Sequence, residues 1–150
     1  MEETLPELEQ LKKERDEYLN GWKRAKADLI NSQKEEARRL EDVIKYANAG
    51  LIKELITVLD SFDLAISVME KDGKGEKGIY MIKSQLEDTL KRAGVEKINV
   101  AAGNPFDANF QEAVAEAESD QPSNTIVDVV EQGYTLNGRV IRPARVRIAK

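Results

Sequence analysis

The residue types that most often carry out catalysis are absent from this chain of 150 residues, which contains neither histidine nor cysteine. Histidine is the commonest general base near neutral pH, and cysteine supplies thiolate nucleophiles, thiolate zinc ligands and disulfides. Carboxylates, lysines and hydroxyls remain, but most of the carboxylates fall at helical spacing on faces that we expect to be exposed. We therefore predict that the protein is not an enzyme and that it holds no cofactor and no metal ion.

The segment Lys71–Gly78 is the stretch that comes nearest to a phosphate-binding loop. Gly73 and Gly78 have the required glycine spacing, but Ile79 and Tyr80 stand where that motif needs a lysine followed by serine or threonine. Three glycines and five charged residues within this segment are unsuited to a helix interior. The segment is therefore predicted to be a reversing connection between two helices.

Basic residues are concentrated near the C-terminal end of the sequence. A basic strip can bind nucleic acid, but the formal net charge of the chain is −5, which disfavours a broad nucleic-acid or anionic-membrane surface. We find no signal peptide and no apolar run of membrane-spanning length, so we expect no nucleic acid, no membrane and a cytoplasmic localisation. The strip consists of Arg139, Arg142, Arg145, Arg147 and Lys150.

A predicted hairpin carries the first residue of this strip. Asn137-Gly138 is the preferred pair for a two-residue type I′ turn, and β-forming residues flank it. Exposed loop tips are frequent contact elements, and Arg139 would place a positive charge beside the Asn137-Gly138 tip. On the residues alone, two interpretations stay open: the tip binds a partner, or it is only a turn.

A long amphipathic helix must organise the N-terminal half. Apolar residues recur at helical steps from Leu11 to Met69 without an intervening proline, and some repeat every eleven residues, which corresponds to about 3.67 residues per turn. Such a helix has no core of its own, so we expect it to pair with a second copy in a parallel dimer. The predicted dimerisation residues are Tyr18, Trp22, Leu29, Leu40, Ile44, Leu51, Leu55, Phe62 and Ile66.

The apolar stripe is diluted by polar residues before Leu40 and broader after it. We therefore assign residues 1–39 to a two-stranded stalk. A second amphipathic helix, predicted over residues 79–93, can fold back on the first. Residues 40–94 would then form a helical hairpin that contributes to a four-helix bundle across the dimer.

Short alternating segments and turns over residues 95–150 predict a small β-rich head, so the predicted fold class is α+β. Glu112–Glu118 is ambiguous, because its alternation of Ala or Val with Glu suits a strand or a helix. The predicted head core consists of Val100, Phe106, Val114, Ile126, Val129, Val140, Val146 and Ile148.

Four segments in this order resemble motifs of the GrpE family, the nucleotide-exchange factors of the bacterial chaperone DnaK. They are Arg24–Asn31, Val58–Ala65, Phe106–Val114 and Gly133–Val146. The chain also departs from the family pattern at several positions. Ala108 and Gln111 replace the usual proline and histidine of the third motif. Family members often have a basic residue at three further positions in the stalk and at its junction with the bundle. This chain has Gln33, Asp42 and Leu64 there.

The resemblance implies a homodimeric cochaperone of protein folding and the heat-shock response. One head would bind the nucleotide-binding domain of DnaK, open its cleft and accelerate ADP release. A protein that prefers the open cleft must weaken nucleotide binding by the same factor. The residues implied to contact DnaK are Arg139, Asn137, Gly138, Val130 and Val68, whereas Tyr134, Phe106 and Pro143 would hold the head together.

A structural coiled-coil adaptor is the alternative from a different class. Its β head would dock on an unrelated partner, and it would leave nucleotide release from DnaK unchanged. A nucleic-acid-binding protein that uses the basic strip is a third reading, which the net charge disfavours.

Overall fold

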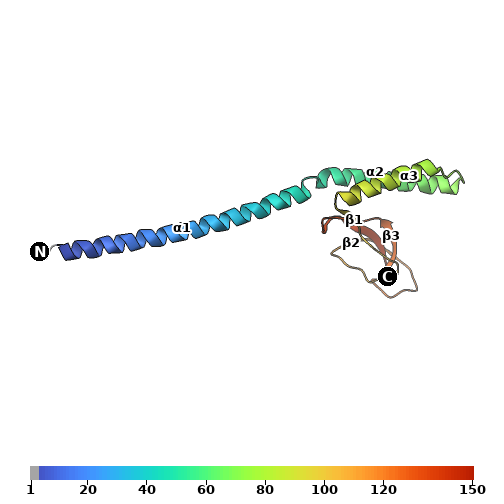
Figure 1. The fold of residues 1–150 in the computed structure, drawn as a ribbon. Coiled ribbons are helices and arrows are strands. Elements are labelled where there is room, and N and C mark those ends of the chain that lie inside the picture. The colour runs from blue at the N-terminus through green and yellow to red at the C-terminus, as the bar shows by residue number, and fades with distance from the viewer. Residues whose placement is uncertain (1–3) are drawn as a thin grey trace. The chain divides into compact units, whose positions relative to one another are not determined.

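The structure is a computed structural model and describes residues 4–150 (Figure 1). Its helices are α1 (Thr4–Tyr46), α2 (Ala49–Lys71) and α3 (Lys77–Arg92), and a β-rich region follows them. The predicted α+β class is confirmed. The chain divides into two compact units with the boundary between Ile44 and Lys45.

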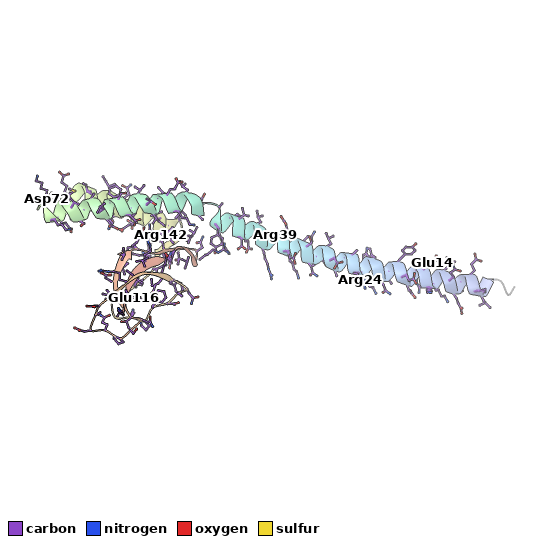
Figure 2. The ribbon with its side chains drawn as sticks, turned by 180° about the vertical axis from the view of Figure 1, so that it is seen from behind. Glu14, Arg24, Arg39, Asp72, Glu116 and Arg142 are labelled. Atoms are coloured by element: carbon purple, nitrogen blue, oxygen red, sulfur yellow. The ribbon has the colours of Figure 1, made fainter. Side chains whose placement is uncertain are left out.

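Helix α1 provides nearly all of the first unit. Every residue from Leu5 to Lys45 is exposed, including Tyr18 at 78% and Trp22 at 59%. Its side chains project on all sides of the helix, as those of Glu14, Arg24 and Arg39 show (Figure 2). Within the described chain, the apolar stripe of α1 therefore has no protein surface to cover it.

The long helix is not continuous. The sequence predicts one unbroken helix from Leu11 to Met69, but the structure has a turn at Ala47 and Asn48, between α1 and α2. The residues on either side of this turn are helical, and no proline stands near it. Asn137, from a distant part of the chain, contacts Lys45 beside this turn.

Helices α2 and α3 form the predicted hairpin and lie side by side (Figure 1). The Lys83 ammonium bonds the Asp63 carboxylate at 2.6 Å, and the Tyr80 hydroxyl donates to Glu70 Oε1 at 2.6 Å. After α3 the chain turns at Gly94, whose φ of +91° lies in the left-handed region that glycine adopts easily. The predicted reversing connection and the second helix are both confirmed.

Two small sheets make up the head. One contains β1 (Val95–Lys97), β4 (Tyr134–Leu136) and β5 (Arg139–Arg142), in the order β1-β4-β5 with antiparallel pairing. The other contains β2 (Gln111–Ala117), β6 (Ala144–Ala149) and β3 (Ile126–Glu131), in the order β2-β6-β3. Strand β2 runs parallel to β6, whereas β3 is antiparallel to it. The ambiguous segment is thus a strand.

Two apolar cores hold the second unit together. The first joins the helical hairpin to the sheet β1-β4-β5, with Ile56, Leu59 and Leu136 almost completely buried. The second lies inside the head around Ile126 and Val146. The second core was largely predicted: it includes every residue named above except Val114. The first core was not predicted, because it depends on how the head packs against the helices.

Candidate partner-binding surface

The hairpin tip has the predicted geometry. Asn137 and Gly138 have φ values of +47° and +84°, as the two central residues of a type I′ turn require. The turn joins β4 to β5, and Asn137, Gly138 and Arg139 are all exposed. Local sequence chemistry is enough to explain this element.

The tip is held by contacts with other parts of the second unit. The Asn137 amide N–H donates to the Gly94 carbonyl at 2.9 Å, and Asn137 Nδ2 donates to the Lys45 carbonyl at 3.0 Å. The Tyr46 hydroxyl donates to the Asn137 carbonyl at 3.3 Å. The Arg139 guanidinium lies over the Tyr46 ring, 3.9 Å from its centroid. Asn137 and Arg139 therefore make intramolecular contacts that sequence reasoning did not anticipate.

A groove of about 640 Å³ lies between α2 and the head. Two exposed aliphatic side chains line it, Leu64 of α2 at 68% and Val130 of β3 at 57%. Neither Val68 nor any residue of the hairpin tip lines the groove. The complete set of lining residues is Asp60, Asp63, Leu64, Lys97, Val130, Glu131, Gln132 and Arg145.

Most of the charged residues that line this groove form ion pairs within the chain. Arg142 Nη1 and Nη2 bond the two Asp60 oxygens at 2.5 and 3.0 Å, and the same guanidinium donates to the Gln132 carbonyl from Nη2 at 2.6 Å and Nε at 3.0 Å. The Asp60 carboxylate raises the pKa of Arg142. Figure 2 marks Arg142, which ties the head to α2. Because the Asp60 charge is already paired, the exposed aliphatic residues are the part of the groove best suited to a partner.

The remaining predicted contact residue, Val68, is 52% exposed near the end of α2. The structure thus brings Val130 together with Leu64, and places Val68 and the hairpin tip elsewhere. Neither Leu64 nor Asp60 was among the residues predicted to bind a partner. The exposed apolar character of Leu64 was visible in the sequence, whereas the proximity of Asp60 to Arg142 had no local signal.

The predicted dimerisation residues differ in how much surface they offer. Six of them are between 58% and 78% exposed: Tyr18, Trp22, Leu29, Leu40, Ile44 and Leu51. Leu55 and Phe62 are half-buried, and Ile66 is already buried within the single chain. The first six offer the greatest exposed fraction to a second copy.

Residues 4–150 contain no group of three or more aspartate or glutamate side chains arranged to hold a metal ion. No helix among them combines the length and the apolar character needed to cross a membrane.

Comparison with known proteins adds the family. The GrpE family model matches residues 1–150. Protein GrpE of Alkaliphilus oremlandii is 35% identical over 138 residues, which cover 90% of this chain and 73% of that protein. Protein GrpE of Pediococcus pentosaceus is 33% identical over 149 residues, covering 98% and 78%. Protein GrpE of Oceanobacillus iheyensis is 36% identical over 147 residues, covering 96% and 77%. With a family match along its whole length and relatives of this similarity, the chain belongs to the GrpE family.

Proposed function

We propose that this protein is a homodimeric cochaperone that binds the nucleotide-binding domain of DnaK, opens its cleft and accelerates ADP release. The observation that carries this proposal is the family match over residues 1–150. The protein would act by linkage, because binding the open cleft more tightly than the closed one weakens nucleotide binding by the same factor. No residue of this chain need touch the nucleotide, which agrees with a surface made of aliphatic and paired charged side chains. Cytoplasmic localisation remains a prediction.

The exposed stripe of α1 supports the homodimer. Contiguous apolar surface that a single chain leaves uncovered usually marks an interaction site. The stripe repeats every eleven residues through Tyr18, Leu29 and Leu40, a period that suits two nearly straight helices lying together. A second copy of the chain has an apolar stripe of the same period, so its α1 helix is the partner that best matches this surface.

The groove between α2 and β3 is our choice for the main apolar contact with DnaK. It contains Val130, which the family resemblance implies as a contact, and adds Leu64 as a neighbouring aliphatic residue. Arg139, Asn137, Gly138 and Val68 remain proposed contacts outside the groove.

The test measures the release of a fluorescent ADP analogue from DnaK by stopped flow, with and without the protein. We expect acceleration by the native protein and at least about a fivefold loss of that effect for Val130→Asp and for Leu64→Asp, since each places an unpaired charge in an apolar contact. Ser123→Asp is the matched control, because Ser123 is exposed in the loop before β3 and outside the groove. Equal activity of all three variants would remove the groove from the binding surface.

The adaptor hypothesis predicts a different result in the same assay. Its head would bind a partner other than DnaK, and ADP release would not change. No observation in the structure favours it over the exchange factor.

A further inference from the structure

The local sequence weakens the long helix at Ala47 and Asn48, because Asn48 and Gly50 have low helix propensity and Asn48 is the N-cap residue of α2. No proline lies between Leu11 and Met69, and the apolar stripe continues across the turn through Ile44, Ala47 and Leu51. Alanine is also the residue with the highest helix propensity. The local sequence thus permits a helix here without enforcing one, and α1 ends at Tyr46 while α2 begins at Ala49.

The side chain of Asn137 occupies a hydrogen-bonding position that a continuous helix would use. In an unbroken α-helix the Lys45 carbonyl accepts the backbone N–H four residues later, which is that of Ala49. Here Asn137 Nδ2 donates to this carbonyl at 3.0 Å. A side chain inserted into the backbone hydrogen-bond ladder is a known cause of helix kinks. It also satisfies a carbonyl at the end of α1 that would otherwise lack an intrahelical partner.

Tyr46 and Arg139 strengthen the same junction. The Arg139 guanidinium stacks on the Tyr46 ring at 3.9 Å, and the Tyr46 hydroxyl donates to the Asn137 carbonyl at 3.3 Å. The ring also packs against the core between the helices and the sheet β1-β4-β5. A cation at the C-terminal end of a helix interacts favourably with the helix dipole, so Arg139 favours an end at Tyr46.

Gly94 lies against both the backbone and the side chain of Asn137. Its carbonyl accepts the Asn137 backbone N–H at 2.9 Å. A Cβ atom at position 94 would lie 2.2 Å from Asn137 Oδ1, so a larger residue there would displace the Asn137 carboxamide from its present position. Asn137 is therefore bonded through its backbone N–H to Gly94 and through its side-chain Nδ2 to Lys45.

We propose that Asn137 and Arg139 form a latch that ends α1 at Tyr46. When the latch is released, the helix runs on through Ala47 and Asn48 into α2. The two states exclude each other, because the Lys45 carbonyl accepts either the Asn137 side chain or the Ala49 amide in good geometry. The hairpin tip thereby gains a conformational role that is independent of any partner protein.

The test uses NMR Cα chemical shifts of Ala47 and Asn48 in the full chain without DnaK. Asn137→Asp removes the donor but keeps the turn, because Asp-Gly also favours type I′. We expect both shifts to move to helical values in this variant and in Tyr46→Leu, which removes the stacked ring. Asn99→Asp is the control, since it adds the same charge at another exposed asparagine, and its shifts should match the native protein.

Shifts that keep their turn values in both variants, with the β3 and β6 signals of a folded head, would overturn the latch. A converse variant covers the case in which the head of Asn137→Asp does not fold. Asn48→Ala raises helix propensity at the turn, so it should extend the helix and abolish the ring-current shift of the Arg139 side-chain protons. An extended helix with that ring-current shift intact would also overturn the proposal, because the two states would then coexist.

Discussion

At the scale of single residues, Arg142 joins parts of the chain that are far apart in sequence. Its guanidinium bonds Asp60 and the Gln132 carbonyl at once, and its side chain is 19% exposed. Such multiple charge-assisted hydrogen bonds in a partly buried site are stronger than surface ion pairs. The sequence placed Arg142 in a basic strip, but the pairing with Asp60 spans 82 positions and leaves no local pattern.

Arg142→Met should lower the free energy of unfolding by about 2 kcal/mol, because it leaves Asp60 without its main partner. Arg145→Met is the matched control. Arg145 is 46% exposed, and its contacts with Glu131 and Glu112 are 3.5 and 3.9 Å long, so its loss should change stability by less than about 0.5 kcal/mol. Urea unfolding followed by circular dichroism measures both. Equal losses in the two variants would contradict the special role of Arg142.

Tyr134 provides a prediction about alkaline pH. Burial, and then the negative charge of Asp60, raises the pKa of its phenol above the ordinary value near 10. The folded state thus favours the neutral phenol. Its contribution to stability is complete below the unfolded pKa and is lost as pH rises through the folded pKa.

We therefore expect the native protein to lose stability relative to Tyr134→Phe as pH rises above 10, since phenylalanine cannot ionise. Urea midpoints of the two proteins at pH 8 and pH 11 provide the comparison. A difference between their midpoints that is the same at both pH values would show that Tyr134 does not contribute to the alkaline loss.

At the scale of elements, the glycine between β3 and β4 shows what close backbone packing demands. Gly133 is buried, and a Cβ there would lie 2.3 Å from the Ala144 nitrogen and 2.8 Å from the Ala144 Cα. These are backbone atoms at the start of β6, so they cannot rotate away as a side chain could. Gly133 thus allows the two segments to approach each other.

Gly133→Ala should destabilise the head by about 3 kcal/mol, a typical upper value for overpacking. Gly78→Ala is the control in a position with nothing within 4 Å. Gly78 lies in the first turn of α3, so alanine there should stabilise by up to about 1 kcal/mol. Thermal melting of both variants would test the contrast, and an unchanged melting temperature for Gly133→Ala would contradict it.

The elements also show where prediction from sequence succeeds. Helix α3 and the Asn137-Gly138 turn follow from local periodicity and turn chemistry, and both were predicted. The segment Gln111–Ala117 stayed ambiguous because its strand character comes from parallel pairing with β6, more than 25 positions away. The turn at Ala47 was not predicted either, and the residue that we propose to stabilise it, Asn137, lies more than 90 positions away from Lys45.

At the scale of the whole molecule, the exposed stripe of α1 is the feature that a single chain does not explain. Leu40 and Ile44 are 60% and 70% exposed. We expect the double variant Leu40→Asp, Ile44→Asp to dissociate the proposed dimer, because charges would be buried between the helices. Asn31→Asp, which lies off the stripe, should leave it intact. Sedimentation equilibrium measures the molecular mass of the native protein and of both variants. A native protein that is monomeric at all concentrations would contradict the dimer.

The central claim is that this chain accelerates nucleotide exchange on DnaK. The most direct measurement is stopped-flow release of a fluorescent ADP analogue from DnaK, at micromolar concentrations of the native protein and with excess unlabelled nucleotide. We predict that the release rate rises with the concentration of the protein and then saturates, with an increase of at least about fivefold. A release rate that stays constant while binding to DnaK is demonstrated in the same sample would contradict it.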